Sequence, residues 1–142
     1  VCIYECHVRA FIECQNLPKR IHSADIPLHT EIPHESVANI APEALWDRLH
    51  NDEIMDMIID VREPLEFKEG HILEAQLIPL PKLLLDGLEL PKDREIILVC
   101  RGGRRSMRAA YVLQNKGYDN VRFLQGGMIA WEANGLLAAI DI

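Results

Sequence analysis

One of the four cysteines, Cys100, lies far from the other three, in a short segment rich in glycine and arginine. Two consecutive glycines follow it closely, and positions 100–108 hold four arginines and no acidic residue. Paired glycines let the backbone turn tightly and direct several N–H groups inward. Positive charge and inward N–H groups favour the thiolate, which is the nucleophilic form of cysteine. The segment therefore predicts an anion-binding site built around a cysteine nucleophile.

The segments on either side of Cys100 are the elements that would position it. Residues 95–99 form a continuous aliphatic run, which is typical of a buried parallel strand. Residues 106–116 indicate a helix with Ser106 as its N-cap and Gly117 just beyond its end. In α/β proteins, ligands bind beyond the carboxyl ends of central strands. Glycines alone would suit an ordinary turn, and arginines alone a solvated helix face, but the combination favours an active-site loop.

Apolar and amphipathic segments alternate through the rest of the chain from about residue 40. Further strands are predicted at residues 55–61, 75–78 and 121–124, and further helices at residues 41–49, 64–69, 82–88 and 128–134. This alternation is typical of an α/β fold with a parallel sheet and helices on both faces. We therefore predict one α/β domain over residues 36–142.

The first 35 residues follow a different pattern. Cys2, Cys6 and Cys14 share the apolar face of a period-two stretch, which predicts a half-buried strand, and the prolines of residues 16–33 indicate a linker. Their spacing differs from that of common structural zinc sites, and a strand keeps them too far apart to bridge one another. We expect no metal here, and cysteines that pack against the domain, a second subunit or a fused neighbour.

The chain of 142 residues is acidic, with 15 Lys and Arg against 22 Asp and Glu and a formal net charge of −7. Nucleic-acid binding requires clustered basic side chains, so this balance argues against it. Every apolar run is far shorter than the roughly 18 residues that span a bilayer. The cysteines are also too sparse for a secreted disulfide scaffold. We predict a cytoplasmic protein with no nucleic-acid or membrane partner.

Four segments, in the expected order, resemble the rhodanese (thiosulfate sulfurtransferase) superfamily. The segment from Cys100 to Ser106 resembles its active-site loop, and residues 59–63 (Ile-Asp-Val-Arg-Glu) resemble an early motif at a strand end. Residues 67–72 are similar to its Gly-His-Ile element, and residues 123–131 to its late Gly-Gly…Trp element. One departure is residues 73–75, Leu-Glu-Ala, where the family usually has Pro-Gly-Ala.

The resemblance implies transfer of sulfane sulfur by double displacement, without a metal or organic cofactor. Cys100 would attack thiosulfate or a similar anionic donor, hold a persulfide, and pass the sulfur to a thiol or to cyanide. The loop's N–H groups and guanidinium groups would bind the anion. The substrate-binding residues implied are Arg101, Gly102, Gly103, Arg104, Arg105 and Ser106.

Asp60 and Arg62 are candidates for a supporting role, since they lie at the end of a neighbouring strand. A purely structural role is the alternative. Asp60 could organise the turn before Pro64, and Arg62 could pair with Glu63 or Glu66.

Two other functions remain open. The domain could be a sulfur carrier or a docking module of a larger protein, which a first residue other than Met permits. A phosphatase or arsenate reductase would need an arginine six positions after the cysteine, where this chain has Ser106. A tighter loop suits sulfur better than a phosphoryl group.

Overall fold

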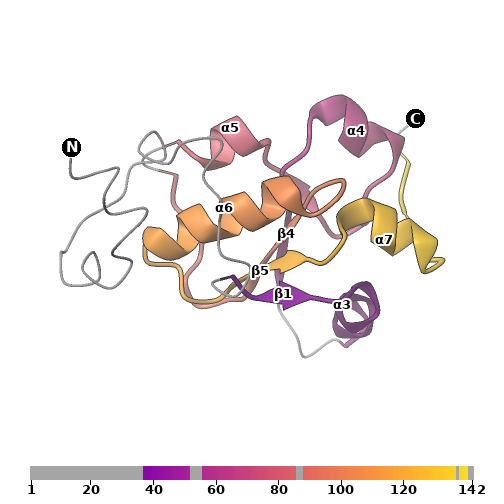
Figure 1. The fold of residues 1–142 in the computed structure, drawn as a ribbon, viewed down its shortest axis with the longest axis horizontal. Helices are drawn as coiled ribbons and strands as arrows, with labels where there is room; N and C mark the ends of the chain where they lie inside the picture. Colours follow the sequence, from indigo (N-terminus) through magenta and orange to yellow (C-terminus); the bar gives the residue numbers. More distant parts are fainter. Residues whose placement is uncertain (1–36, 52–55, 86–87, 137, 141–142) are drawn as a thin grey trace.

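Five strands form a single sheet in the order β1-β5-β4-β2-β3, and every neighbouring pair is parallel. Figure 1 shows β1, β5 and β4 next to one another. The computed structural model describes residues 37–51, 56–85, 88–136 and 138–140. The strands are β1 (Asn39–Ile40), β2 (Met57–Asp60), β3 (Gln76–Leu77), β4 (Ile96–Val99) and β5 (Val121–Leu124). The predicted parallel α/β class is confirmed. The predicted amino-terminal strand and linker lie outside the described residues.

The described residues form five helices, four of which are divided between the two faces of the sheet. The five are α3 (Pro42–Leu49), α4 (Pro64–Glu69), α5 (Leu80–Leu83), α6 (Arg104–Asn115) and α7 (Gly127–Ala133). One core packs α5 and α6 on the sheet and includes Ile59, Leu98 and Leu113. The other packs α3 and α7 on the opposite face and includes Ile97 and Trp131. Successive residues of a strand thus enter different cores, which explains why the strands are apolar at nearly every position.

The central strand β4 is the most deeply buried element. Each residue from Ile96 to Val99 is at most 1% exposed, because β2 and β5 flank the strand and helices cover both faces. Its aliphatic run made this strand predictable from sequence. Since Cys100 follows it at once, the thiol emerges at the centre of the carboxyl edge of the sheet.

Two helix predictions were wrong at their starts. Helix α6 begins at Arg104, with Gly103 in the left-handed conformation (φ 100°) before it, so Ser106 lies inside the first turn and is not the N-cap. The glycine reverses the chain direction and lets the helix start early. The helix predicted at residues 82–88 is the short α5, which starts at Leu80 because a proline is tolerated in the first turn. Leu84 and Leu85 lie in the turn that follows it.

Strand β1 was not predicted. Its two residues pair with β5 at the edge of the sheet, and a segment this short carries no recognisable periodicity. Within the described residues, no helix combines the length and the apolar character needed to cross a bilayer.

Candidate active site

The Cys100 side chain is buried beneath its own loop. Only 1% of the residue is exposed, and the backbone N–H of Gly103 donates a hydrogen bond to Sγ at 3.0 Å. The Ser106 Oγ lies 3.2 Å from the same sulfur and 3.2 Å from the Gly103 carbonyl oxygen. A hydroxyl has a single proton, so it can donate to only one of these two atoms at a time. When the sulfur is a thiolate, both Gly103 and Ser106 can donate to it.

The loop backbone is held in place by the start of α7. Met128 N–H donates to the Cys100 carbonyl oxygen at 2.8 Å, and Ile129 N–H donates to the Arg101 carbonyl oxygen at 3.0 Å. Gly127 makes this approach possible, because its φ is +60° and a Cβ there would lie 2.5 Å from the Arg101 carbonyl oxygen. It would lie closer still to the Cys100 carbonyl oxygen. The late glycine-rich segment therefore holds the backbone of the cysteine loop by hydrogen bonds and close packing.

The arginines of the loop have unequal roles. Both terminal nitrogens of Arg105 donate to the Glu66 carboxylate of α4, each at 2.9 Å. These hydrogen bonds are the main reason that the pKa of Glu66 falls from 4.5 to about 2 and that the pKa of Arg105 is raised. Arg101 and Arg104 are exposed, with no ion pair within the part of the chain that the structure describes. The role of these arginines in attracting an anionic donor stays a prediction.

Asp60 and Arg62 form a buried ion pair at the carboxyl end of β2. The single N–H of Arg62 Nε is shared between the two Asp60 carboxylate oxygens, at 2.9 and 3.1 Å, and Nη2 donates to the carboxylate at 2.8 Å. Nη2 also donates to the Gly70 carbonyl oxygen at 2.6 Å. The expected pairing of Arg62 with Glu63 or Glu66 was wrong, because the buried Asp60, two residues away, is the nearer partner in the folded chain. The pair lies beside the loop, and its supporting role stays a prediction.

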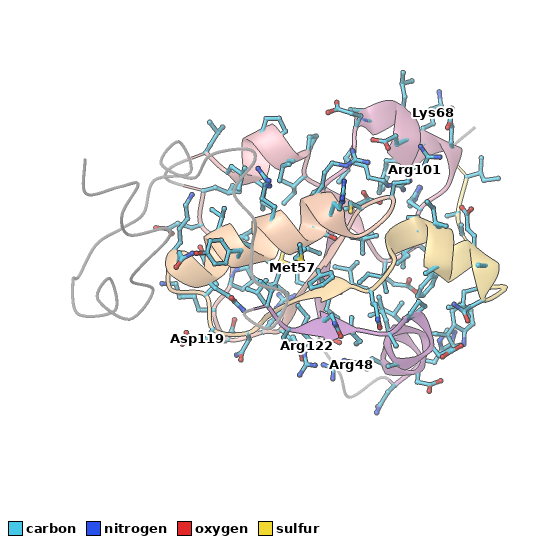
Figure 2. The ribbon with its side chains drawn as sticks, in the orientation of Figure 1. Arg48, Met57, Lys68, Arg101, Asp119 and Arg122 are labelled. Atoms are coloured by element: carbon cyan, nitrogen blue, oxygen red, sulfur yellow. The ribbon has the colours of Figure 1, made fainter. Side chains whose placement is uncertain are left out.

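A pocket of about 450 Å³ opens next to the cysteine loop. It lies among Arg101, α4, the following Gly70 and the start of α7, and Figure 2 shows Arg101 between these two helices. Its walls combine cationic, acidic and apolar side chains. The lining residues are Arg62, Glu66, Glu69, Gly70, Arg101, Met128, Ile129 and Glu132.

Sequence reasoning missed the acidic part of this pocket. Glu69 comes from the end of α4 and Glu132 from α7, on segments far apart in the chain. Glu69 belongs to the Gly-His-Ile segment and Glu132 directly follows the Gly-Gly…Trp segment, but neither residue stood out by type or spacing. The role of Gly127 was missed as well, although the glycine pair at positions 126–127 was a visible signal of close backbone approach.

The described residues contain no group of three or more His, Cys, Asp or Glu side chains that could hold a metal ion. Cys2, Cys6 and Cys14, for which no metal was expected, lie outside the described residues. The expectations for the amino-terminal segment therefore stay predictions.

The chain is similar to several bacterial proteins with names from sulfur chemistry. It is 38% identical over 100 residues to a sulfurtransferase of Allochromatium vinosum, a match that covers 70% of this chain and 92% of the relative. It is 36% identical to a putative sulfurtransferase of Bacillus subtilis, over 68% and 91% of the two chains. A putative sulfur carrier protein of Bacillus subtilis is 33% identical, but there the match covers only 55% of the relative.

Solved structures and the family comparison agree with this similarity. A rhodanese-related protein from Thermoplasma volcanium superimposes with a TM-score of 0.66 at 26% identity, over 73% of this chain and 99% of that one. Residues 41–134 match the Rhodanese-like domain family, which spans both the buried cysteine loop and the α7 segment that supports it. This chain belongs to the family of rhodanese-like domains.

Proposed function

We propose that this protein is a sulfurtransferase that carries sulfane sulfur as a persulfide on Cys100. The observation that carries the proposal is the donor arrangement at the sulfur, where Gly103 N–H and the Ser106 hydroxyl both reach Sγ. The relatives named sulfurtransferase support sulfur transfer in general. Thiosulfate, or another small donor with sulfane sulfur, is the proposed source of the sulfur.

The first half-reaction forms one S–S bond and breaks another. The Cys100 thiolate attacks the outer sulfur of thiosulfate, and sulfite departs with the electron pair of the broken bond. No external oxidant or reductant is needed, and no partner base is required because sulfite is a weakly basic leaving group. Fixed N–H donors stabilise the charge on sulfur without reorganising during the reaction.

The second half-reaction returns the enzyme to its starting state. A thiolate or cyanide attacks the outer sulfur of the persulfide and takes it, and the Cys100 thiolate is the leaving group. The same donors that held the thiolate before loading receive it again. Gly103 and Ser106 therefore act in both halves of the cycle.

Intact-mass measurement after incubation with thiosulfate tests this proposal. The wild-type protein should gain the mass of one sulfur atom, and a reducing thiol should remove it. Cys100→Ser is the matched variant, since it changes the reactive atom alone, and it should gain nothing. Sulfur addition to Cys100→Ser would overturn the proposal.

A second candidate is a sulfur carrier or docking module within a longer protein. The putative sulfur carrier relative favours it, as does a probable adenylyltransferase/sulfurtransferase of Mycobacterium tuberculosis, in which the match covers only 24% of the relative. A carrier would load the persulfide but turn over slowly with cyanide. Phosphatase activity has less support, because the sixth position after the cysteine is the buried Ser106 rather than an arginine. Assays of one preparation with thiosulfate and cyanide, and with an aryl phosphate, separate the three functions.

A further inference from the structure

The pocket beside the cysteine loop has a cationic inner wall. Arg62 is only 6% exposed, and the Asp60 carboxylate and the Gly70 carbonyl oxygen fix its Nε and Nη2. Its third nitrogen, Nη1, has no hydrogen-bond partner within the described part of the chain, since the side-chain bonds of Arg62 come from Nε and Nη2. Arg62 lines the pocket, as does the exposed Arg101 next to the nucleophile. A buried guanidinium held in one orientation with donors left over is suited to bind a carboxylate or a similar anion.

The other charged residues that line the pocket are acidic. Glu66 is neutralised by Arg105, but Glu69 and Glu132 are exposed and have no ion pair among the described residues. The Glu132 carboxylate lies near Gly70, since a Cβ added at Gly70 would be 3.6 Å from Glu132 Oε1. Lys68 is exposed but does not line the pocket, and Figure 2 shows it on the outer side of α4.

The balance of charge disfavours a ligand that is only an anion. Two arginines and three glutamates line the pocket, and the outer partners Asp60 and Arg105 leave a net charge of −1. Glu69 and Glu132 would repel a small dianion and attract an ammonium group. Met128 and Ile129 supply apolar contact for a short carbon chain.

We propose that this pocket binds a low-molecular-weight thiol that carries both a carboxylate and an ammonium group, and that this thiol is the acceptor of the sulfur held on Cys100. The carboxylate is bound by the guanidinium groups of Arg62 and Arg101, and the ammonium group by Glu69 and Glu132. The proposal rests on the proposed function, since it requires a persulfide on Cys100.

The transfer step is balanced without a further reactant. The thiolate of the bound acceptor attacks the outer sulfur of the Cys100 persulfide and forms a new S–S bond. The bond between that sulfur and Cys100 Sγ breaks, and Cys100 leaves as the thiolate. The products are the persulfide of the small thiol and the free enzyme, and the proton of the original thiol goes to solvent.

The test measures the rate at which persulfide-loaded protein loses its sulfur to four thiols. Cysteine carries both charged groups, 3-mercaptopropionate only the carboxylate, cysteamine only the ammonium group, and 2-mercaptoethanol neither. Each second-order rate constant is divided by the fraction of thiolate present, which removes the difference in thiol acidity. For wild-type protein we expect cysteine to exceed each of the other three.

Variants separate pocket recognition from intrinsic thiol reactivity. The relative reactivity of two thiols is the same for every protein, so it cancels when the ratio of their rate constants in a variant is compared with the wild-type ratio. Glu69→Gln and Glu132→Gln should each lower the ratio of cysteine to 3-mercaptopropionate by roughly threefold, and together by roughly tenfold. Arg101→Gln should instead lower the ratio of cysteine to cysteamine. Glu43→Gln is the matched control, since Glu43 is an exposed acid on α3 that does not line the pocket.

The outcomes are distinct. Ratios that fall in the pocket variants and stay unchanged in Glu43→Gln support the proposal. A protein that loads sulfur and discharges it equally to all four thiols overturns this inference and leaves the proposed function intact. If Glu69→Gln and Glu132→Gln leave the ratio of cysteine to 3-mercaptopropionate unchanged, this inference is likewise overturned and the proposed function stays intact. A protein that never gains sulfur overturns both.

Discussion

The two ends of the same parallel strands both hold clusters of charged side chains, but the clusters are built differently. At the amino end, Arg48 of α3 bridges Asp56 and Glu95, each at 2.7 Å, and Arg122 of β5 also pairs with Glu95. The arginine side chains of this cluster are 31% and 44% exposed. No nucleophile lies among its members. This cluster ties the strands together at their starts.

At the carboxyl end the arginine itself is buried. The side chains of Arg62 and Asp60 are 7% and 0% exposed, and Arg62 keeps one nitrogen without a partner within the described residues. Arg62 lines the pocket, and the candidate nucleophile Cys100 follows Val99, the β4 residue that pairs with Asp60. The comparison shows that ion pairing alone does not mark a functional site. The carboxyl end differs in the burial of its ion pair, in the arginine nitrogen left without a partner among the described residues, and in a cavity lined by Arg101, the residue after Cys100.

The largest expected difference between the two ends is in the cost of losing an arginine. Arg62→Gln leaves the fully buried Asp60 carboxylate without its ion partner, so we expect the free energy of unfolding to fall by about 3–5 kcal/mol. Arg48→Gln removes a partly exposed arginine but leaves the Asp56 carboxylate, whose side chain is 5% exposed, without this partner, so we expect a smaller loss of about 1–2 kcal/mol. Urea denaturation of both variants measures the difference. Equal losses would show that the two clusters do not differ as described.

A smaller effect is expected from the glycine that supports the cysteine loop. Gly127→Ala places a Cβ against the carbonyl oxygens of Cys100 and Arg101 at a positive φ, and we expect a loss of about 2–4 kcal/mol from strain and overpacking. It should also slow persulfide formation, because the loop has to move.

Gly135→Ala is the control for Gly127→Ala. Gly135 has a similar φ of +72°, but a Cβ there meets nothing within 4 Å, so only the backbone strain of about 1–2 kcal/mol is expected. Persulfide formation in this variant should match that of the wild type. If both variants lose stability and activity equally, close packing at Gly127 is not what positions the loop.

The smallest effect concerns the pair that joins α4 to α6. The pKa of Glu66 is lowered from 4.5 to about 2, so the folded protein favours the carboxylate, and the resulting stability is present above pH 4.5. It is lost as pH falls toward 2. Both side chains are about one-third exposed, which limits the contribution to about 0.5–1 kcal/mol.

Unfolding measured between pH 7 and pH 2 tests this contribution. Wild-type protein should be more stable than Glu66→Gln at pH 7, and the two should converge as the carboxylate is protonated. A difference that persists unchanged at pH 2 would mean that the charge of Glu66 is not its source. Glu43→Gln again provides a matched change of charge outside the ion pair.

The candidate nucleophile Cys100 and its setting could be predicted because they depend on neighbours in the sequence. The aliphatic run of β4, the paired glycines and the following helix are all local, and they identified Cys100 and its place at the sheet edge. The start of α6 was misjudged because Ser106 has the residue type of an N-cap. In the folded chain Gly103 turns the backbone first, which places the serine hydroxyl at the sulfur.

The pocket could not be predicted, because it depends on contacts between distant segments. Glu66 and Arg105 meet across 39 positions of the chain, and Glu132 comes from a different helix again. No spacing rule connects such residues before the sheet has brought α4, α6 and α7 together. The pairing of Arg62 with Asp60 was missed for a related reason, since adjacent acids compete and only the fold determines which one is buried.

Peptide mass spectrometry shows directly whether sulfur is carried on Cys100. Protein treated with thiosulfate is digested, and the peptide that contains residues 100–101 is analysed by mass spectrometry after alkylation of free thiols. We expect one additional sulfur atom on Cys100, absent from Cys100→Ser and removed by a reducing thiol. Sulfur found on another cysteine, with Cys100 alkylated as a free thiol, would contradict it.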